Sequence, residues 1–457
     1  MLSKFLYALL MLPMLIATPA KITVGMSADY PPFEFKQDGK IVGFDVDLAK
    51  EIGKHLGAEI EIKEMAFSMV FNALNQGEID LIISSITISE EKSKNYDFST
   101  PYYFDTLAIL HKCNHPITKE TLSGKSIACQ LGASGMHSWL KTQPSGIKIV
   151  LMDVMTQMAE AIKAGHVDGA LMDAAQAKEF AKNSKELSYT VVGNIANGTA
   201  ITMKKGSPLK AKINRAIEEL KNKGTLKTLE NKWVEGDTKK TNHTLLTDLL
   251  FIAKGLPITL TYSFLAIFLG GLLGMVFAVT RHIKHGAKAI TWIIISFISL
   301  IRGTPTLLQL SFVYFSAPTL IGVKLSVLAA GVLTLGINSA AYIAEILRSG
   351  LQNLPKGQFD AAKALNISKW YTWKDIIMPQ VLRNVFPSLI NEIVTLTKET
   401  ALVSVLGEMD IMRRAQALAA ETYNYFEPMC LAGIIYYLLI KTIEYIGKSL
   451  EKRWNHA

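Results

Sequence analysis

Long apolar runs dominate this sequence only after Leu249, whereas residues 21 to about 245 alternate short apolar and polar stretches. This division indicates two solvents, because a run of about 20 apolar residues is long enough to cross a bilayer as a helix. The net charge of +9 fits either a nucleic-acid partner or a membrane protein with basic cytoplasmic loops. The clustering of the apolar residues favours the membrane, and we expect no nucleic-acid partner.

The first twenty residues form a separate region. MLSKFLYALLMLPMLIATPA has one lysine, a short apolar run and small residues at its end, which is typical of a signal peptide. An uncleaved N-terminal anchor is the alternative, and either one places the following domain outside the cytoplasmic membrane. Of the three cysteines, only Cys113 and Cys129 could pair in an oxidising compartment, and the sequence leaves that pairing open.

Strand and helix patterns alternate along residues 21–235. KITVGMS and AEIEIKEM are typical of strands, and FDVDLAKEIGKHLG is typical of a helix that ends at Gly57. The alternation predicts an α/β domain with parallel strands. Ligands of such sheets bind beyond the carboxyl ends of the strands. The polar side chains expected there are Ser84, Ser85, Thr87, Ser134 and Asp173.

Three motifs, in order, resemble the family-3 extracellular solute-binding proteins, which are periplasmic polar-amino-acid receptors of ABC importers. They are YPPFEFKQDGKIVGFDVDLAKEIG, LNQGEIDLIISSITISEEKSKNYDFSTPYY and AGHVDGALMDAAQA. The resemblance covers residues 21–235 and implies a type II periplasmic-binding-protein fold, whose two lobes close on the ligand by hinge motion. Lobe one would comprise residues 21–107 and 203–235, and lobe two residues 108–200, with crossings near residues 106–110 and 197–202.

The resemblance also implies an amino-acid site. An aromatic pair, Tyr30 and Phe67, would sandwich the ligand side chain. Ser84 and Asp173 would hold the α-ammonium group, to which a carboxylate supplies a charge-assisted hydrogen bond. The α-carboxylate would be bound by a second group of side chains, and Ser85 is a further ligand-binding candidate. This second group is Thr87, Lys92 and Ser134.

Two departures from the family pattern concern the ligand. Lys92 stands where the family usually has Arg, so the charge is kept but the planar two-point fork is lost. Ser27 stands where members specific for basic amino acids or glutamine often carry Asp, and Asp29 or Glu34 could compensate. We expect a basic amino acid such as arginine as ligand, with glutamine next.

Five apolar segments follow a linker at residues 236–248, and predict an all-α five-helix transmembrane domain over residues 249–457. They are residues 249–280, 289–318, 325–347, 388–406 and 428–446. The second segment contains RGTP, which predicts a break or a re-entrant start. Five spans put the two ends of the domain on opposite sides, and the basic stretches then fall inside. We therefore expect a multi-pass protein of a bacterial inner membrane with its N-terminal domain on the periplasmic side.

The stretch DAAKALNISKWYTWKDIIMP, residues 360–379, lies on the expected inner side. It resembles the EAA loop of type I ABC importer permeases, which forms a coupling helix that docks on a cytoplasmic ABC ATPase subunit. The matching positions are Asp360, Ala361, Ala362, Asn366 and Pro379. Asp replaces the usual Glu and Asn replaces Gly. Asn can adopt the left-handed conformation that Gly takes more freely.

Two ionisable residues, Lys398 and Glu399, fall within the fourth segment. Ionisable groups inside a membrane are costly and usually face the interior or a cavity. Both are candidates for lining the substrate path, with a structural role at a helix interface as the alternative.

No nucleotide-binding loop of the form G-x-x-x-x-G-K-[ST] was found. The nearest match ends in LSGKS, but Lys119 stands where the first Gly is needed and a strand, not a helix, is expected to follow. ATP would therefore be used by a separate subunit, with no cofactor or metal bound by this chain and no enzymatic activity. We expect the chain to be the binding and permease subunit of an ATP-driven importer of polar amino acids, paired with a second permease subunit in a homodimer. The alternative is a ligand-gated channel or sensor with a two-lobed domain.

Overall fold

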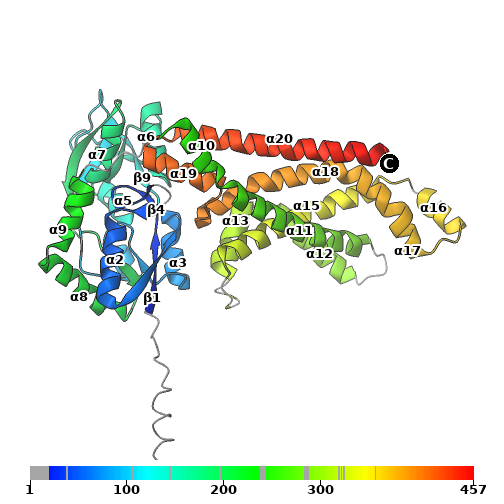
Figure 1. Cartoon of the computed structure of the whole chain (residues 1–457), viewed down its shortest axis with the longest axis horizontal. Coiled ribbons are helices and arrows are strands. Elements are labelled where there is room, and N and C mark those ends of the chain that lie inside the picture. Colours follow the sequence, from blue (N-terminus) through cyan, green and yellow to red (C-terminus); the bar gives the residue numbers. More distant parts are fainter. Residues whose placement is uncertain are drawn as a thin grey trace, which may run out of the picture.

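The computed structural model describes residues 20–37, 40–104, 106–143, 146–194, 197–236, 243–282, 288–317, 320, 322, 325–355 and 357–456. Residues 1–19 of the expected signal segment and residues 237–242 of the expected linker lie outside this set. Figure 1 shows an α/β domain at one end of the molecule and long helices that run from it to the other end.

Lobe one of the α/β domain is built on a five-stranded sheet with the order β5-β1-β6-β13-β7. The first three strands in this order are parallel, and the last two run antiparallel to their neighbours. The strands are β1 (Ala20–Met26), β5 (Ala58–Glu64), β6 (Leu81–Ile82), β7 (Tyr96–Phe98) and β13 (Thr202–Lys204). The helices are α2 (Phe44–Leu56), α3 (Val70–Gln76), α4 (Glu90–Ser93), α8 (Leu209–Asn222) and α9 (Thr225–Glu230), with short helices Phe67–Met69 (η1) and Asn231–Glu235 (η2).

A small antiparallel sheet of β2 (Asp29–Tyr30), β3 (Glu34–Gln37) and β4 (Lys40–Val42) lies between β1 and α2 in the chain. Helix α2 ends as predicted at Gly57, whose φ of 61° is left-handed and whose N–H bonds back to the last turn. Without a Cβ, glycine takes this conformation at little cost.

Lobe two has a second five-stranded sheet with the order β10-β9-β11-β8-β12. Its strands are β8 (Thr106–Lys112), β9 (Ser126–Gln130), β10 (Lys148–Met152), β11 (Gly169–Asp173) and β12 (Leu187–Asn194). Its helices are α5 (Ser134–Lys141), α6 (Met155–Ala164) and α7 (Ala174–Asn183). The expectation of parallel strands holds for three strands of each sheet, whereas β8, β12, β7 and β13 are antiparallel because the chain enters and leaves each lobe along them.

The chain crosses between the lobes twice, and the two crossings pair with each other. The N–H of Thr199 donates to Tyr103 O at 2.8 Å, and the N–H of Tyr102 donates to Thr199 O at 3.0 Å. The first crossing therefore precedes the expected residues 106–110, which already belong to β8 inside lobe two. The two crossings, joined by an antiparallel bridge between Tyr103 and Thr199, form the hinge between the lobes.

The C-terminal half is helical, and all five apolar segments lie in helices. The elements are α10 (Leu245–Ala253), α11 (Leu256–His282), α12 (Lys288–Arg302), α13 (Thr306–Ser311), η3 (Phe312–Ser316), α15 (Val327–Gln352), α16 (Gly357–Ala364), α17 (Lys369–Tyr371), η4 (Thr372–Ile377), α18 (Met378–Glu399), η5 (Thr400–Leu406), α19 (Ile411–Thr422) and α20 (Phe426–His456). Among the described residues, three helical stretches are long and apolar enough to cross a membrane: Leu245–Arg281, Val327–Gln352 and Phe426–Trp454.

The other two segments differ from simple spans. The expected break at RGTP is confirmed, because Ala289–Arg302 and Thr306–Ser316 meet at an angle of 107°. Helix α18 has 22 residues but is not among the three long spans, and it carries four charged side chains. These are Arg383, Glu392, Lys398 and Glu399.

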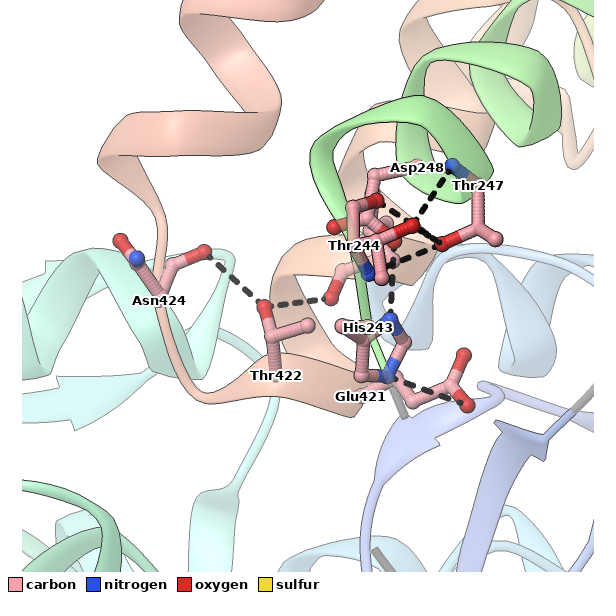
Figure 2. A network of polar contacts seen from close by, with 8 residues as sticks. His243, Thr244, Thr247, Asp248, Glu421, Thr422 and Asn424 are labelled. Atoms are coloured by element: carbon pink, nitrogen blue, oxygen red, sulfur yellow. Dashed lines mark hydrogen bonds and ion pairs between the residues drawn. The ribbon is translucent and has the colours of Figure 1, made fainter. Parts of the chain in front are cut away.

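The start of the helical half is tied to the region where α19 ends (Figure 2). His243 Nδ1 lies 2.9 Å from Asp248 Oδ1, and its Nε2 lies 3.7 Å from Glu421 Oε1. Thr244 and Thr247 form a capping box at the first turn of α10. These contacts hold the end of the linker beside α19, the helix that lies against the α/β domain.

Glycines allow α11 and α15 to pack closely. A Cβ added to Gly274 would lie 2.8 Å from a methyl group of Ile343 and 3.0 Å from Ala340 O, and one on Gly270 would lie 2.9 Å from Ser339 Cβ. Small residues at such positions are common in membrane helix pairs, because packing replaces the hydrophobic effect there. The four-residue spacing places both glycines on one face of α11.

The glycine face gives a stability prediction. Gly274→Ala should destabilise the helical half by about 1–3 kcal/mol, because the methyl group forces α11 and α15 apart. Gly271→Ala is the matched control, since a Cβ there meets nothing within 4 Å. Thermal unfolding of both variants in detergent, followed by tryptophan fluorescence, should show a lower midpoint for Gly274→Ala alone; equal midpoints would contradict the packing argument.

Candidate functional site

A small cavity of about 20 Å³ lies between the two lobes, beyond the carboxyl ends of β6 and β9. Seven of the eight predicted ligand-binding residues line it: Tyr30, Phe67, Ser84, Ser85, Thr87, Lys92 and Ser134. The other lining residues are Ile86, Gln130, Ala133, Gly135 and Met136. The eighth predicted residue, Asp173, ends β11 and accepts a hydrogen bond from the Tyr30 hydroxyl.

Contacts across the cleft show that the lobes are closed. Ser89 Oγ of lobe one lies 3.2 Å from Ser134 Oγ of lobe two, and Lys92 Nζ donates to Gly132 O at 2.9 Å. A cavity of about 20 Å³ has room for roughly one water molecule. An amino acid can therefore enter only when the lobes separate along the hinge.

Asp173 is buried and only partly bonded. One of its carboxylate oxygens accepts from Tyr30, whereas the other, Oδ1, has no hydrogen-bond partner among the described residues. Burial raises the pKa of Asp173 to about 7, with a further rise from the charge of Asp45 and a partial reduction from the Tyr30 hydroxyl. A buried carboxylate of this kind favours a cationic group beside it.

A buried pair of carboxyl groups, Glu34 and Asp45, lies next to Ser84, which is predicted to hold the ammonium group together with Asp173. Ser84 Oγ donates to Glu34 Oε1 at 2.6 Å, and Asp45 Oδ2 accepts from the Ser85 N–H at 2.8 Å and from the Tyr102 hydroxyl at 3.0 Å. Burial, and then the charge of Asp45, raises the pKa of Glu34 well above its usual value. Burial raises the pKa of Asp45 to about 6.

Asp45 is a site residue that the sequence reasoning missed. The stretch FDVDL was interpreted as the start of a helix, and acidic residues in a first turn are ordinary there. In the structure Asp45 holds Ser85, whose φ of 47° is unusual for a residue with a side chain. Such strained residues are often found in binding sites, and only the tertiary contact from α2 to the end of β6 reveals this one.

Asp29 lies beside Ser27, where the family often has Asp. Ser27 Oγ donates to Asp29 Oδ1 at 2.7 Å, and both side chains are buried. Asp29 therefore supplies a carboxylate next to Ser27, the position at which the family often has Asp.

Lys92 remains the cation predicted for the α-carboxylate. Its Nζ lies 4.3 Å from the centre of the Phe71 ring, in addition to its bond to Gly132 O. Burial lowers the pKa of Lys92 to about 8. Its charge is therefore sensitive to mildly alkaline pH.

Among the described residues, the cysteines are free thiols and no metal-binding cluster is present. Cys113 is exposed, Cys129 is buried, and both are free thiols, so the pairing left open by the sequence is not formed. Within the described parts of the chain, no group of three or more His, Cys, Asp or Glu side chains could hold a metal ion. The LSGKS stretch leads directly into strand β9, which a nucleotide-binding loop does not do.

The EAA-like loop lies at the end of the helices remote from the α/β domain (Figure 1). Asp360, Ala361 and Ala362 lie on α16, and Pro379 lies at the first turn of α18. Asn366 has a φ of 54°, so it adopts the left-handed conformation predicted for it. Large apolar side chains are exposed along this loop: Leu365 (73%), Trp370 (70%) and Tyr371 (57%).

The predicted path residues Lys398 and Glu399 end α18 and do not face the same way. Lys398 is exposed, whereas Glu399 is half-buried and accepts a hydrogen bond from Thr306. Thr306 follows the bend between α12 and α13, so Glu399 ties α18 to the broken second segment.

Two family models match the chain. Bacterial extracellular solute-binding proteins, family 3, match residues 22–236, and the binding-protein-dependent transport system inner membrane component matches residues 270–456. These families are transport proteins and not enzymes.

Curated relatives match one half of the chain each. A putative glutamine transport system permease protein GlnP of Rickettsia felis is 48% identical over 205 residues, which are 45% of this chain and 93% of the relative. The arginine transport system permease protein ArtQ of Bacillus subtilis is 42% identical over 203 residues, 44% of this chain and 92% of the relative. The arginine-binding extracellular protein ArtP of Bacillus subtilis is 34% identical over 222 residues, 48% of this chain and 87% of the relative.

Both halves thus match components of one kind of transporter. This chain combines the two-lobed domain and the helical membrane domain in a single polypeptide. This supports the importer prediction over the ligand-gated channel or sensor. The chain belongs to the family-3 extracellular solute-binding proteins through its first half and to the binding-protein-dependent inner-membrane transport components through its second, and it is a fused binding protein and permease of an amino-acid ABC importer.

Proposed function

We propose that this importer takes up a basic amino acid, with arginine as the first candidate. The observation that carries the proposal is the excess of buried carboxylates over cations in the closed cleft. Glu34, Asp45 and Asp173 are buried in the binding domain, and Lys92 is the cation that lines the cavity.

The charges of a bound amino acid account for part of this excess. An α-ammonium group beside Asp173 and an α-carboxylate beside Lys92 form two opposite-charge pairs. After burial itself, the charge of Asp45 raises the pKa of Glu34, whereas a hydrogen bond with Glu34 lowers the pKa of Asp45, since two adjacent carboxylates resist ionising together. That pair therefore holds one negative charge most readily, and a ligand with one extra positive charge balances it.

Glutamine is the second candidate substrate. The permease half is 48% identical to a relative named for glutamine and 42% identical to one named for arginine, and the binding half is 34% identical to a relative named for arginine. A neutral side-chain amide would leave the single negative charge of the Glu34–Asp45 pair without a ligand cation to balance it. The two candidates thus differ in the charge that the cleft must accommodate.

The EAA-like loop is the docking site for a cytoplasmic ABC ATPase subunit, which binds and hydrolyses the ATP. Asp360 and Ala361 are exposed on α16, near the exposed apolar side chains of Leu365 and Trp370, whereas Ala362 is buried and packs the helix against its neighbours. Exposed aromatic and aliphatic side chains of this kind are typical of interaction surfaces. The position of the loop, at the end of the helices opposite the binding domain, supports a location on the other side of the membrane.

The chain works as a homodimer in a bacterial inner membrane, with the binding domain on the periplasmic side and residues 1–20 directing its export. Five helical segments are few for a closed pathway, so a second permease domain completes it. Helix α20 runs to the same end of the molecule as the EAA-like loop (Figure 1), which supports a C-terminus on the inner side. Lys398 and Glu399 lie on the path or stabilise its wall.

Ligand binding tests the substrate. The full chain in nanodiscs should bind L-arginine in calorimetry more tightly than the other nineteen amino acids, and Asp173→Asn should weaken binding by about 10–100-fold, the loss expected for a hydrogen bond to a charged group. Asp168→Asn in the same lobe is the control, because the half-exposed carboxylate of Asp168 forms an ion pair with Lys125 instead of a contact with Tyr30. Preference for L-glutamine would replace arginine in the proposal, and no binding of any amino acid by a folded chain would contradict it.

Binding should depend on pH with a maximum between about 7 and 8. Below that range Asp173, with a pKa of about 7, must lose a proton to hold the ammonium group, so affinity rises as pH rises. Above about 8, Lys92 loses its proton and its attraction for the carboxylate, so affinity falls. Titrations from pH 5 to 9 should show both limbs, and Lys92→Arg should remove the alkaline decline because Arg stays protonated.

The left-handed residue of the EAA-like loop gives a test of coupling. Asn366→Gly should keep transport, and Asn366→Val should lower it, because a β-branched residue at φ 54° costs about 1–2 kcal/mol. Uptake of labelled amino acid by cells that carry the importer and its ATPase measures this, with ligand binding as the control. Equal uptake by both variants would show that the turn after α16 does not matter for coupling.

A further inference from the structure

A cavity of about 480 Å³ lies where the binding domain meets α10, α19 and α20 of the helical half. Its walls come from β3 of lobe one, α7 of lobe two, the start of α10 and the turn between α19 and α20. Among the described residues, it shares no lining residue with the small cavity between the lobes. Small-molecule sites usually measure about 300–1,000 Å³, so this cavity has room for an organic ligand.

The turn between α19 and α20 forms one wall and is held by hydrogen bonds (Figure 2). Thr422 Oγ1 donates to a carbonyl in the last turn of α19 at 2.8 Å, and Asn424 Oδ1 accepts from the Phe426 N–H at 3.2 Å. Between them, Tyr423 has a φ of 55°, which is unusual for a residue with a side chain. Its ring packs edge-to-face on Phe180 of α7, with 5.1 Å between the ring centres. The turn is therefore fixed against lobe two.

His243 fixes two acidic side chains of the cavity wall (Figure 2). Its Nδ1 lies 2.9 Å from Asp248 Oδ1 and its Nε2 lies 3.7 Å from Glu421 Oε1. All three side chains line the cavity. The imidazole thus places a carboxylate of α10 and a carboxylate of α19 in one wall.

Glu179 of α7 is a buried carboxylate that faces the same space. The residue is 8% exposed and lines the cavity. In the described part of the chain its carboxylate has no hydrogen-bond or ion-pair partner, since the bond from Asn183 goes to the backbone oxygen of Glu179. A carboxylate withdrawn from water needs a cation, a hydrogen-bond donor or a proton. The cavity is the place from which a ligand could supply one.

Acidic groups outnumber basic ones among the described residues that line the cavity. The carboxylates are Glu179, Asp248, Glu421 and Glu427, and the basic side chains are Lys182 and His243. Even with His243 protonated, these side chains carry more negative than positive charge. A cavity with an excess of one sign concentrates ligands of the opposite sign. The lining therefore favours a cation and disfavours an anion.

The lining fits an organic cation better than a metal ion. Among the described residues, no group of three or more His, Cys, Asp or Glu side chains could hold a metal. The walls also include the aromatic rings of Phe35 and Tyr423 and the apolar side chain of Leu431. Ammonium and guanidinium groups bind both carboxylates and aromatic faces, so an organic cation uses both kinds of wall.

We propose that this cavity binds a small organic cation with ammonium or guanidinium groups, at a site separate from the amino acid in the cleft. Glu179 binds one cationic group from the side of lobe two, and Glu427 at the start of α20 attracts a second from the membrane half. Helix α7 begins directly after Asp173 of the cleft and carries Glu179 in its second half. The proposed ligand thus lies towards the other end of the helix that starts at the amino-acid site.

Agmatine and putrescine are suitable probes, because each carries two positive charges and neither has the carboxylate that Lys92 is proposed to bind in the cleft. Calorimetry on the full chain in nanodiscs should show binding of at least one of them. Glu179→Gln, which keeps the shape of the side chain and removes its charge, should weaken that binding by about tenfold. Glu427→Gln should weaken it by about threefold, because an exposed charge contributes less.

Two further variants separate this site from its surroundings. Glu160→Gln is the matched control, since it removes a carboxylate of lobe two that pairs with Lys163 outside the cavity, and it should bind the probe as the parent does. Asp173→Asn should also leave probe binding unchanged, although it weakens amino-acid binding in the cleft. Glu179→Gln should show the reverse, with amino-acid binding unchanged. The two sites are thus tested independently of each other.

Tighter binding of agmatine would identify the ligand as a guanidinium compound, and tighter binding of putrescine would identify it as a diamine; both support the site. If Glu179→Gln does not fold, the comparison of Glu427→Gln with Glu160→Gln decides. The proposal is overturned if neither probe binds the folded parent chain, or if the variants at Glu179 and Glu427 bind as tightly as the parent. Loss of probe binding in Asp173→Asn alone would place the probe in the cleft and would equally overturn it.

Discussion

A carboxylate that leaves water needs a cation, a hydrogen-bond donor or a proton, and the closed cleft of this protein brings several carboxylates out of water together. Glu34, Asp45 and Asp173 are buried within it, and the donors that reach them come from Ser84, Ser85 and tyrosine hydroxyls. These donors satisfy some oxygens and leave others without partners. The domain therefore gains most from closure when a positively charged ligand completes the set.

Buried charge also joins the binding domain to the permease half. Arg413 of α19 lies 3.0 Å from Glu64 of lobe one, which also pairs with Lys36. One ion-pair cluster thus contains residues of lobe one and of the membrane half. Fusing receptor and permease in one chain keeps these partners at a high local concentration, so docking needs less affinity than it would between separate proteins.

The membrane half relies on different forces, because apolar side chains gain little by leaving lipid. Close packing of glycines between α11 and α15 and polar links between helices take over this role. Ser339 donates to Glu392 at 2.8 Å and joins α15 to α18, and Glu345 joins Arg281 and Arg348 near the end that carries the EAA-like loop. These links join the helices that lie between the binding domain and the loop, and transmission of a movement across the membrane requires such connections.

Much of this protein could be predicted from its sequence. The division into two halves follows from the clustering of apolar residues, the bend at RGTP from a glycine and a proline within an apolar segment, and the left-handed turn at Asn366 from the spacing of the EAA-like motif. The ligand residues at strand ends were predicted because the carboxyl ends of parallel strands meet at one edge of a sheet. All of these features follow from local sequence patterns and from the periodic spacing of apolar residues.

The tertiary structure decided what local pattern could not contain. Asp45 looked like an ordinary first-turn acid until folding placed it against Ser85, and the strands that carry the hinge proved antiparallel because the chain crosses between lobes along them. Arg413 lies 349 residues from Glu64 in the chain, and no periodicity links the two. The sequence by itself determined the two domains, the elements and the residue types of the site; only the packing of distant segments decided which charges share a low-dielectric environment, because burial and distance set the strength of electrostatic interactions.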